Sequence, residues 1–178
     1  MPQPKKIVVI GPESTGKSTL CEQLATNYKT DWVPEYAREY LMKLGRPYTY
    51  DDLLIIAKGQ LDLEDRIAAS SKSPLLFVDT DMYVMKIWCE YVFGKCHPFI
   101  LNEIVNRKYD VYLLCNTDLP WVADELREYP DIESRERLFH MYKDLMINQS
   151  TPWYEISGNY DERLQRAMSF IYGLWVMD

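Results

Sequence analysis

Residues 11 to 18 carry the most specific chemical signal in this sequence. They read Gly-Pro-Glu-Ser-Thr-Gly-Lys-Ser, which fits the phosphate-binding spacing G-x-x-x-x-G-K-[ST], and they directly follow the apolar run Ile7 to Ile10. Glycines at the two fixed positions let the backbone curl, so that successive N–H groups and the start of a helix face an anionic phosphate. The alternative is an ordinary glycine turn between a strand and a helix, which the full motif disfavours.

Each residue type in this motif has an expected task. Lys17 should reach the β and γ phosphates of a nucleotide, and the Ser18 hydroxyl should bind Mg²⁺. The guanine-selective sequence N-K-x-D is absent, because the segment 116–118 reads Asn-Thr-Asp, so we expect ATP. The predicted cofactor-binding residues are Gly11, Glu13, Ser14, Thr15, Gly16, Lys17, Ser18 and Thr19.

Two carboxylates directly follow apparent strands, as the phosphate loop does, so we expect them at the same edge of a parallel sheet. A kinase that acts on a hydroxyl needs one carboxylate near the acceptor oxygen and another for the metal or its waters. We assign Asp79, together with Ser18, to Mg²⁺, and Glu35 to the acceptor hydroxyl as a base or orienting group. Asp81 shares this neighbourhood, and helix N-capping is an equally good interpretation of it.

Two polar residues on predicted helices are candidates for the acceptor site. Arg38 lies one turn after Glu35 and could face the same cleft, although an ion pair with Glu35 or Glu39 explains it equally well. Gln60 lies inside a long apolar helix and is a candidate to hydrogen-bond the acceptor.

Strand and helix patterns alternate along the chain, which predicts a parallel sheet covered by helices on both faces. The fold class we predict is α/β: a three-layer P-loop NTPase sandwich with a five-stranded parallel sheet and a helical lid at about 118–149, in one domain over 1–178. The predicted strands are 7–10, 31–33, 75–78, 111–115 and 153–156. The first predicted helix follows the phosphate loop and ends at about 27. The others are 35–44, 53–69, 81–93, 98–107 and a last helix that begins at about 159. Capping boxes are expected at Thr49 with Asp52 and at Asn159 with Glu162. The last helix should turn an apolar stripe to the core, made of Leu164, Met168, Ile171 and Trp175.

Bulk composition fits one compact domain. With 178 residues, 47% of them hydrophobic, the chain can bury a single core. Its 20 basic and 27 acidic side chains give a net charge of −7, which disfavours nucleic acid as a partner. No apolar run approaches the ~20 residues that span a bilayer, and nothing resembles a signal peptide, so we expect a cytoplasmic protein with no membrane association. The four cysteines are widely spaced and read as reduced thiols.

Several further motifs occur in an order typical of one family. They are Glu35-Tyr36-Ala37-Arg38-Glu39-Tyr40, Asp79-Thr80-Asp81, Gly94-Lys95-Cys96-His97-Pro98-Phe99 and Trp121-Val122-Ala123-Asp124-Glu125-Leu126-Arg127. With the phosphate loop, they make nearly the whole chain resemble the ribosylnicotinamide kinase domain of NadR-type bacterial NAD-salvage proteins. The resemblance implies a P-loop kinase with ATP·Mg²⁺ as donor and a ribose 5′-hydroxyl as acceptor, here as a stand-alone domain.

The resemblance also helps to choose among three arginines of the predicted lid that could contact the transferring phosphate. Arg127 belongs to one of the shared motifs, so it is preferred as the cation that closes over the transferring phosphate. For Arg135 and Arg137 we favour a solvated helix face.

The family can place an aromatic residue before the Glu-Tyr pair to stack on the nicotinamide ring, and Pro34 stands there instead. Trp32, Tyr36 and Trp88 are candidate replacements, although core packing is the more common role of such residues. We therefore expect a nicotinamide riboside kinase; the alternatives are a kinase of another small acceptor and a regulatory ATP-binding protein.

Overall fold

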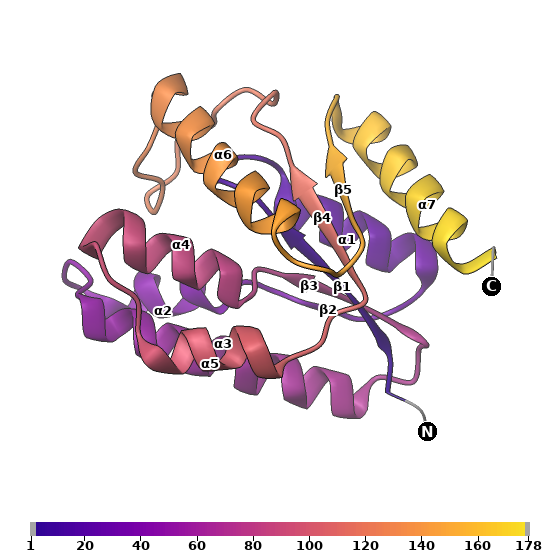
Figure 1. Cartoon of the computed structure of the whole chain (residues 1–178), viewed down its shortest axis with the longest axis horizontal. Coiled ribbons are helices and arrows are strands. Elements are labelled where there is room, and N and C mark those ends of the chain that lie inside the picture. Colours follow the sequence, from indigo (N-terminus) through magenta and orange to yellow (C-terminus); the bar gives the residue numbers. More distant parts are fainter. Residues whose placement is uncertain (1–2, 177–178) are drawn as a thin grey trace.

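The fold is described by a computed structural model that covers residues 3–176, with side chains as far as Leu174. Strands and helices alternate along the chain (Figure 1). Their bounds are β1 Lys5–Ile10, α1 Lys17–Tyr28, β2 Trp32–Val33, α2 Tyr36–Leu44, α3 Tyr50–Ser70, β3 Leu75–Asp79, α4 Met82–Phe93, α5 Pro98–Asn106, β4 Val111–Cys115, α6 Ile132–Ile147, β5 Trp153–Ile156 and α7 Tyr160–Val176.

The five strands form one parallel sheet in the order β2-β3-β1-β4-β5. This confirms the predicted fold class. Because all strands run the same way, their carboxyl ends meet at one edge of the sheet. The phosphate loop after β1, Glu35 after β2 and Asp79 at the end of β3 are therefore brought to the same place.

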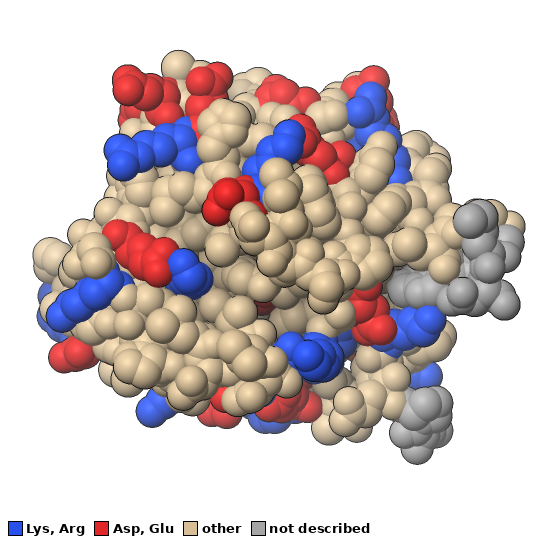
Figure 2. All heavy atoms as spheres, in the orientation of Figure 1, with Lys and Arg blue, Asp and Glu red and all other residues tan. Residues whose placement is uncertain are grey.

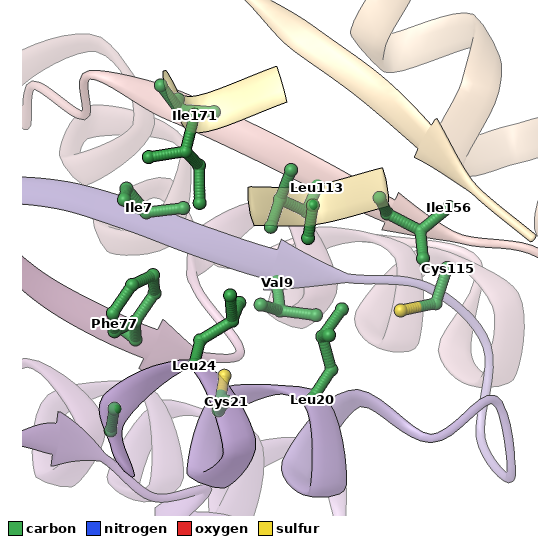
Figure 3. Packing of buried hydrophobic residues seen from close by; sticks show 13 residues of the cluster. Ile7, Val9, Leu20, Cys21, Leu24, Phe77, Leu113, Cys115, Ile156 and Ile171 are labelled. Carbon is green, nitrogen blue, oxygen red and sulfur yellow. The ribbon is translucent and has the colours of Figure 1, made fainter. Parts of the chain in front are cut away.

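Helices cover both faces of the sheet, and the apolar strand β1 contacts helices on each face. Its last four residues are fully buried, and their side chains point alternately to the two faces of the sheet. Ile7 and Val9 pack with α1 and α7, as Figure 3 shows for the α1 side chains Leu20 and Leu24. Residues 8 and 10 pack on the opposite face, against α4 and α6. Helices α2, α3, α4 and α5 share a third apolar cluster at the β2 side of the molecule.

Helix ends follow local capping chemistry. The predicted capping box of Thr49 and Asp52 is present, but it starts α3 at Tyr50, one turn earlier than predicted. Asp81 caps α4 by accepting hydrogen bonds from the backbone N–H groups of residues 83 and 84. The predicted box at residue 159 is also present, because Asn159 and Glu162 bond each other's backbone N–H groups. Of the predicted stripe on α7, the side chain of Trp175 lies outside the described residues.

The segment predicted as a lid divides into two parts. Helix α6 packs into the core through Leu138, Phe139, Tyr142 and Met146, so it forms part of the outer layer over the sheet. Residues 118–131, between β4 and α6, have no regular structure. We call residues 118–131 the lid loop, and we now propose them alone as the lid.

The surface carries mixed charge on the face that Figure 2 shows, with Lys and Arg side chains lying among Asp and Glu side chains. Across residues 3–176, none of the helices combines the length and the apolar character that crossing a bilayer requires.

One helical glycine has a packing role that yields a stability prediction. A Cβ added at Gly59, inside α3, would lie 2.1 Å from the ring of Tyr36. We expect Gly59→Ala to lower the free energy of unfolding by about 1–3 kcal/mol, because the aromatic ring must move, although alanine is the better helix former. Gly173→Ala in α7 is the matched control, since an added Cβ there meets no described atom within 4 Å. It should raise stability by about 0.5–1 kcal/mol. Chemical denaturation measures both, and equal effects would contradict the packing role.

Candidate active site

The phosphate loop has a conformation that its two glycines permit. Gly11 has a φ of 143°, and a Cβ there would lie 2.7 Å from the carbonyl oxygen of Cys115 at the end of β4. Gly16 has a φ of 76° and stands immediately before α1. Ser14 also takes a left-handed φ, 56°, which is uncommon for a residue with a side chain. The loop is thus held in a tight curl whose N–H groups and helix start form an anion-binding cradle.

Lys17, Ser18 and Asp79 meet beside this cradle. The Lys17 ammonium donates a 2.9 Å hydrogen bond to the carbonyl oxygen of Pro12, and the Ser18 hydroxyl donates to the Asp79 carboxylate. Burial, reinforced by the negative charge of Glu35, raises the pKa of Asp79, while Lys17 opposes the shift. A buried carboxylate of this kind is stabilised by an added cation. The hydroxyl and carboxylate together fit Mg²⁺, which prefers oxygen ligands.

The phosphate loop opens into a cavity of about 360 Å³ that is also lined by residues of α1, α2, α4, α6 and the lid loop. Both Glu35 and Lys17 line this cavity. Of the predicted site residues, the cavity wall contains Gly11, Glu13, Ser14, Thr15, Gly16, Lys17, Ser18, Thr19, Glu35, Arg38, Trp88 and Arg127. The structure thus assembles a phosphate cradle, a carboxylate and aromatic surface around one space.

Aromatic side chains line the cavity, and we call five of them the aromatic wall. It is formed by Tyr48, Trp88, Tyr91, Tyr129 and Tyr142. Trp88 donates a 3.1 Å hydrogen bond from its indole nitrogen to the Tyr48 hydroxyl, which in turn donates a 2.8 Å bond to the carboxylate of Glu128. The rings of Tyr91 and Tyr129 pack edge to face at 5.2 Å. Such a wall suits a flat ring, and the carboxylate at its rim favours positive charge.

The lid loop is attached to both sides of the cavity. From α2, Arg38 forms an ion pair with Asp124 at 2.7 Å, which replaces the predicted alternatives of Glu35 and Glu39. On the phosphate side, one carboxylate oxygen of Glu13 accepts hydrogen bonds from the backbone N–H groups of residues 128 and 129, at 2.8 and 2.5 Å. The Ser14 hydroxyl accepts a third, at 2.9 Å, from the N–H of Val122.

Three predicted substrate-binding residues lie elsewhere, and we correct their assignments. Gln60 is 1% exposed; it accepts a 2.8 Å hydrogen bond from the N–H of Tyr36 and lies 3.4 Å from the carbonyl oxygens of Pro34 and Asp79. It therefore links the chain segments that carry the two carboxylates, and it is not among the residues that line the cavity. The Tyr36 ring is committed to packing on α3.

Asp81 is likewise a structural residue. It is 1% exposed, caps α4, and accepts a 2.8 Å hydrogen bond from the Tyr112 hydroxyl. Burial raises its pKa to about 6. The capping interpretation of Asp81 accounts for all of these contacts.

The three arginines after β4 have different environments. Arg127 lines the cavity and donates to the carbonyl oxygen of Val122. Arg137 is exposed, as predicted, and lies 5.7 Å from the centre of the Tyr91 ring. The expectation of a solvated face is wrong for Arg135, which is 4% exposed and donates to the carbonyl oxygens of residues 117 and 119.

A further buried arginine, Arg163 on α7, has no distinguishing signal in the sequence. It is 1% exposed and donates hydrogen bonds to the carbonyl oxygens of Thr15, Asn116 and Gly158. It also forms an ion pair with Asp118. It therefore joins the phosphate loop to the ends of β4 and β5.

Comparison with known proteins places the chain in a family. Residues 6–163 match the AAA domain family, a span that includes the phosphate loop, both carboxylates and the lid loop. The chain belongs to the AAA domain family. Its curated relatives include the trifunctional NAD biosynthesis/regulator protein NadR of Escherichia coli and that of Salmonella typhimurium. Each is 28% identical over 172 residues, which are 94% of this chain and 42% of the relative, so the chain spans less than half of their length.

Solved structures share the fold of this chain. A NadR protein in complex with NR aligns with a TM-score of 0.80 and 24% identity, over 96% of this chain and 51% of the other. A NadR protein in complex with NAD and AMP-PNP gives a TM-score of 0.75, also at 24% identity, over 96% and 49%. Thymidylate kinase from Candida albicans gives 0.67 at 15% identity, over 97% and 92%. The predicted resemblance to NadR-type proteins and the P-loop kinase fold are both confirmed.

Proposed function

We propose that this protein transfers the γ-phosphoryl group of ATP to the 5′-hydroxyl of a nucleoside, with nicotinamide riboside as the leading acceptor. The observation that carries the proposal is the shared cavity, which the phosphate loop, Glu35 and the aromatic wall line together. A protein that only bound a nucleotide would need the cradle but no second, aromatic half. The structural likeness to a NadR protein in complex with NR supports the choice of acceptor.

In the proposed reaction the acceptor oxygen attacks the γ-phosphorus and the bond from that phosphorus to the bridging oxygen breaks, giving ADP and a nucleoside 5′-monophosphate. Glu35 accepts or orients the hydroxyl proton. Lys17, with the N–H groups of the phosphate loop, stabilises charge on the β and γ oxygens, and Arg127 adds a cation from the lid loop. Mg²⁺, held by Ser18 and through water by Asp79, would neutralise further phosphate charge.

The aromatic wall supports a cationic base as the acceptor's ring. The pyridinium ring of nicotinamide riboside carries a positive charge, which aromatic faces attract. Glu35 and Glu128 line the same cavity and add negative potential to it. A nucleoside monophosphate, the acceptor of the thymidylate kinases, would instead require free cations there, and Arg38 is paired with Asp124.

A substrate panel tests this proposal. ADP release by the full chain should be measured with ATP·Mg²⁺ and each of nicotinamide riboside, the common ribonucleosides and thymidine monophosphate, with mass spectrometry of the products. We expect nicotinamide riboside to give the largest stimulation, with mononucleotide and ADP formed in equal amounts. Stimulation by another acceptor alone would reassign the substrate. If no acceptor stimulates ADP release, the regulatory ATP-binding protein becomes the better account.

A further inference from the structure

The side chain of Glu13 has a task that its place in the phosphate-binding motif does not suggest. In such a loop the backbone N–H groups bind phosphate, so the side chain at this position is free for other use. Here its carboxylate accepts the backbone N–H groups of Glu128 and Tyr129, more than a hundred residues away in sequence. Hydrogen bonds to an ionised acceptor are about twice as strong as neutral ones. Glu13 therefore fixes two consecutive residues of the lid loop.

The two residues that Glu13 holds support the acceptor side of the cavity. The carboxylate of Glu128 receives the hydrogen bond from Tyr48, which receives the one from Trp88. The ring of Tyr129 packs against Tyr91. All of these side chains line the cavity. A chain of contacts thus runs from the phosphate loop through the lid backbone to the aromatic wall.

We propose that Glu13 is a positioning residue that couples the two halves of the site, by holding the lid loop so that the aromatic wall is complete. This inference rests on the proposed function, because it treats the aromatic wall as the acceptor site. Loss of the carboxylate frees residues 128 and 129, and with them the rim of the wall. The donor site keeps its backbone cradle, Lys17 and Ser18. Glu13 therefore acts on acceptor binding more than on ATP binding.

Two variants at Glu13 separate this role from a general loss of structure. Glu13→Gln keeps an oxygen that can accept both N–H groups but loses the charge, whereas Glu13→Ala loses the acceptor altogether. We expect the KM for the acceptor to rise about tenfold or more in Glu13→Ala and less in Glu13→Gln. The Kd for ATP should change less than about threefold in either variant. Glu22→Ala, an exposed glutamate on α1, is the control and should match the parent protein.

A second readout is independent of catalysis. The bond after Arg127 lies next to the N–H groups that Glu13 holds, and trypsin cleaves after arginine only where the chain can open locally. Cleavage at this bond, followed by mass spectrometry, should be about tenfold faster in Glu13→Ala than in Glu22→Ala, with Glu13→Gln between them.

The outcomes distinguish failure of this inference from failure of the proposed function. An unchanged cleavage rate in Glu13→Ala would overturn the lid attachment whatever the activity. Equal losses of ATP and acceptor affinity would show that Glu13 belongs to the donor site and would overturn the coupling. If cleavage accelerates as expected but no nucleoside stimulates ADP release, the attachment stands, the proposed function fails, and the coupling to an acceptor falls with it.

Discussion

Lys17→Ala should abolish phosphoryl transfer. Its ammonium lies beside the phosphate loop, where it would contact the β and γ oxygens through charge-assisted hydrogen bonds. Loss of one such bond costs about 1.5–3 kcal/mol, which corresponds to a roughly 10- to 150-fold higher Kd for ATP. The rate falls further because the transition state carries more charge on these oxygens than the ground state does. Calorimetric titration with ATP and an ADP-release assay measure the two effects.

Lys72→Ala is the matched control for this experiment, because Lys72 is exposed on the loop before β3. It removes the same charge and should behave as the parent protein. Transfer at the parent rate by a folded Lys17→Ala protein would remove the basis for a P-loop kinase.

Glu35→Gln should slow the acceptor-dependent reaction by about 10²- to 10⁴-fold, the usual contribution of a general base or a group that orients the nucleophile. ATP affinity should change little, because we assign Glu35, at the start of α2, to the acceptor hydroxyl and not to the phosphates. Single-turnover kinetics with saturating ATP and nicotinamide riboside measure the chemical step directly.

Glu39→Gln is the control for Glu35→Gln, since Glu39 lies one turn along α2 and pairs with the exposed Lys43. Such an exposed pair contributes little, so this variant should keep its activity. If Glu35→Gln retains the parent rate with every acceptor, another group must activate the hydroxyl.

The sequence was sufficient for the fold and for the residues around the phosphates because both follow from local pattern. Alternating apolar runs predicted all five strands, and parallel strands bring the residues that follow them to one edge. Glu35 and Asp79 are therefore close in space, close enough for one charge to shift the other's pKa. Strand patterns and the direction of a parallel sheet are enough for this prediction, and no knowledge of side-chain packing is needed.

The lid and the aromatic wall were harder to predict, because they depend on contacts between loops. The pairing of Glu13 with residues 128 and 129 has no periodicity that could indicate it. The predicted lid included α6 because this helix is rich in charge. Its apolar residues at 138, 139, 142 and 146 recur at helical spacing, and this was the available signal that the helix joins the core. For Gln60, the sequence predicted a position inside a long apolar helix. It did not predict which groups the side-chain amide would bond.

The contacts of Arg163 make the phosphate loop dependent on a helix that is synthesised long after it. This guanidinium bonds a carbonyl 148 residues earlier in sequence, at Thr15, and the ends of two strands as well. A nascent polypeptide that has emerged only as far as β4 has the whole binding motif but lacks the group that fastens it to its neighbours. We therefore expect high-affinity nucleotide binding only once α7 has docked. Where ATP is abundant, mass action would then favour the folded domain over its partly folded precursors.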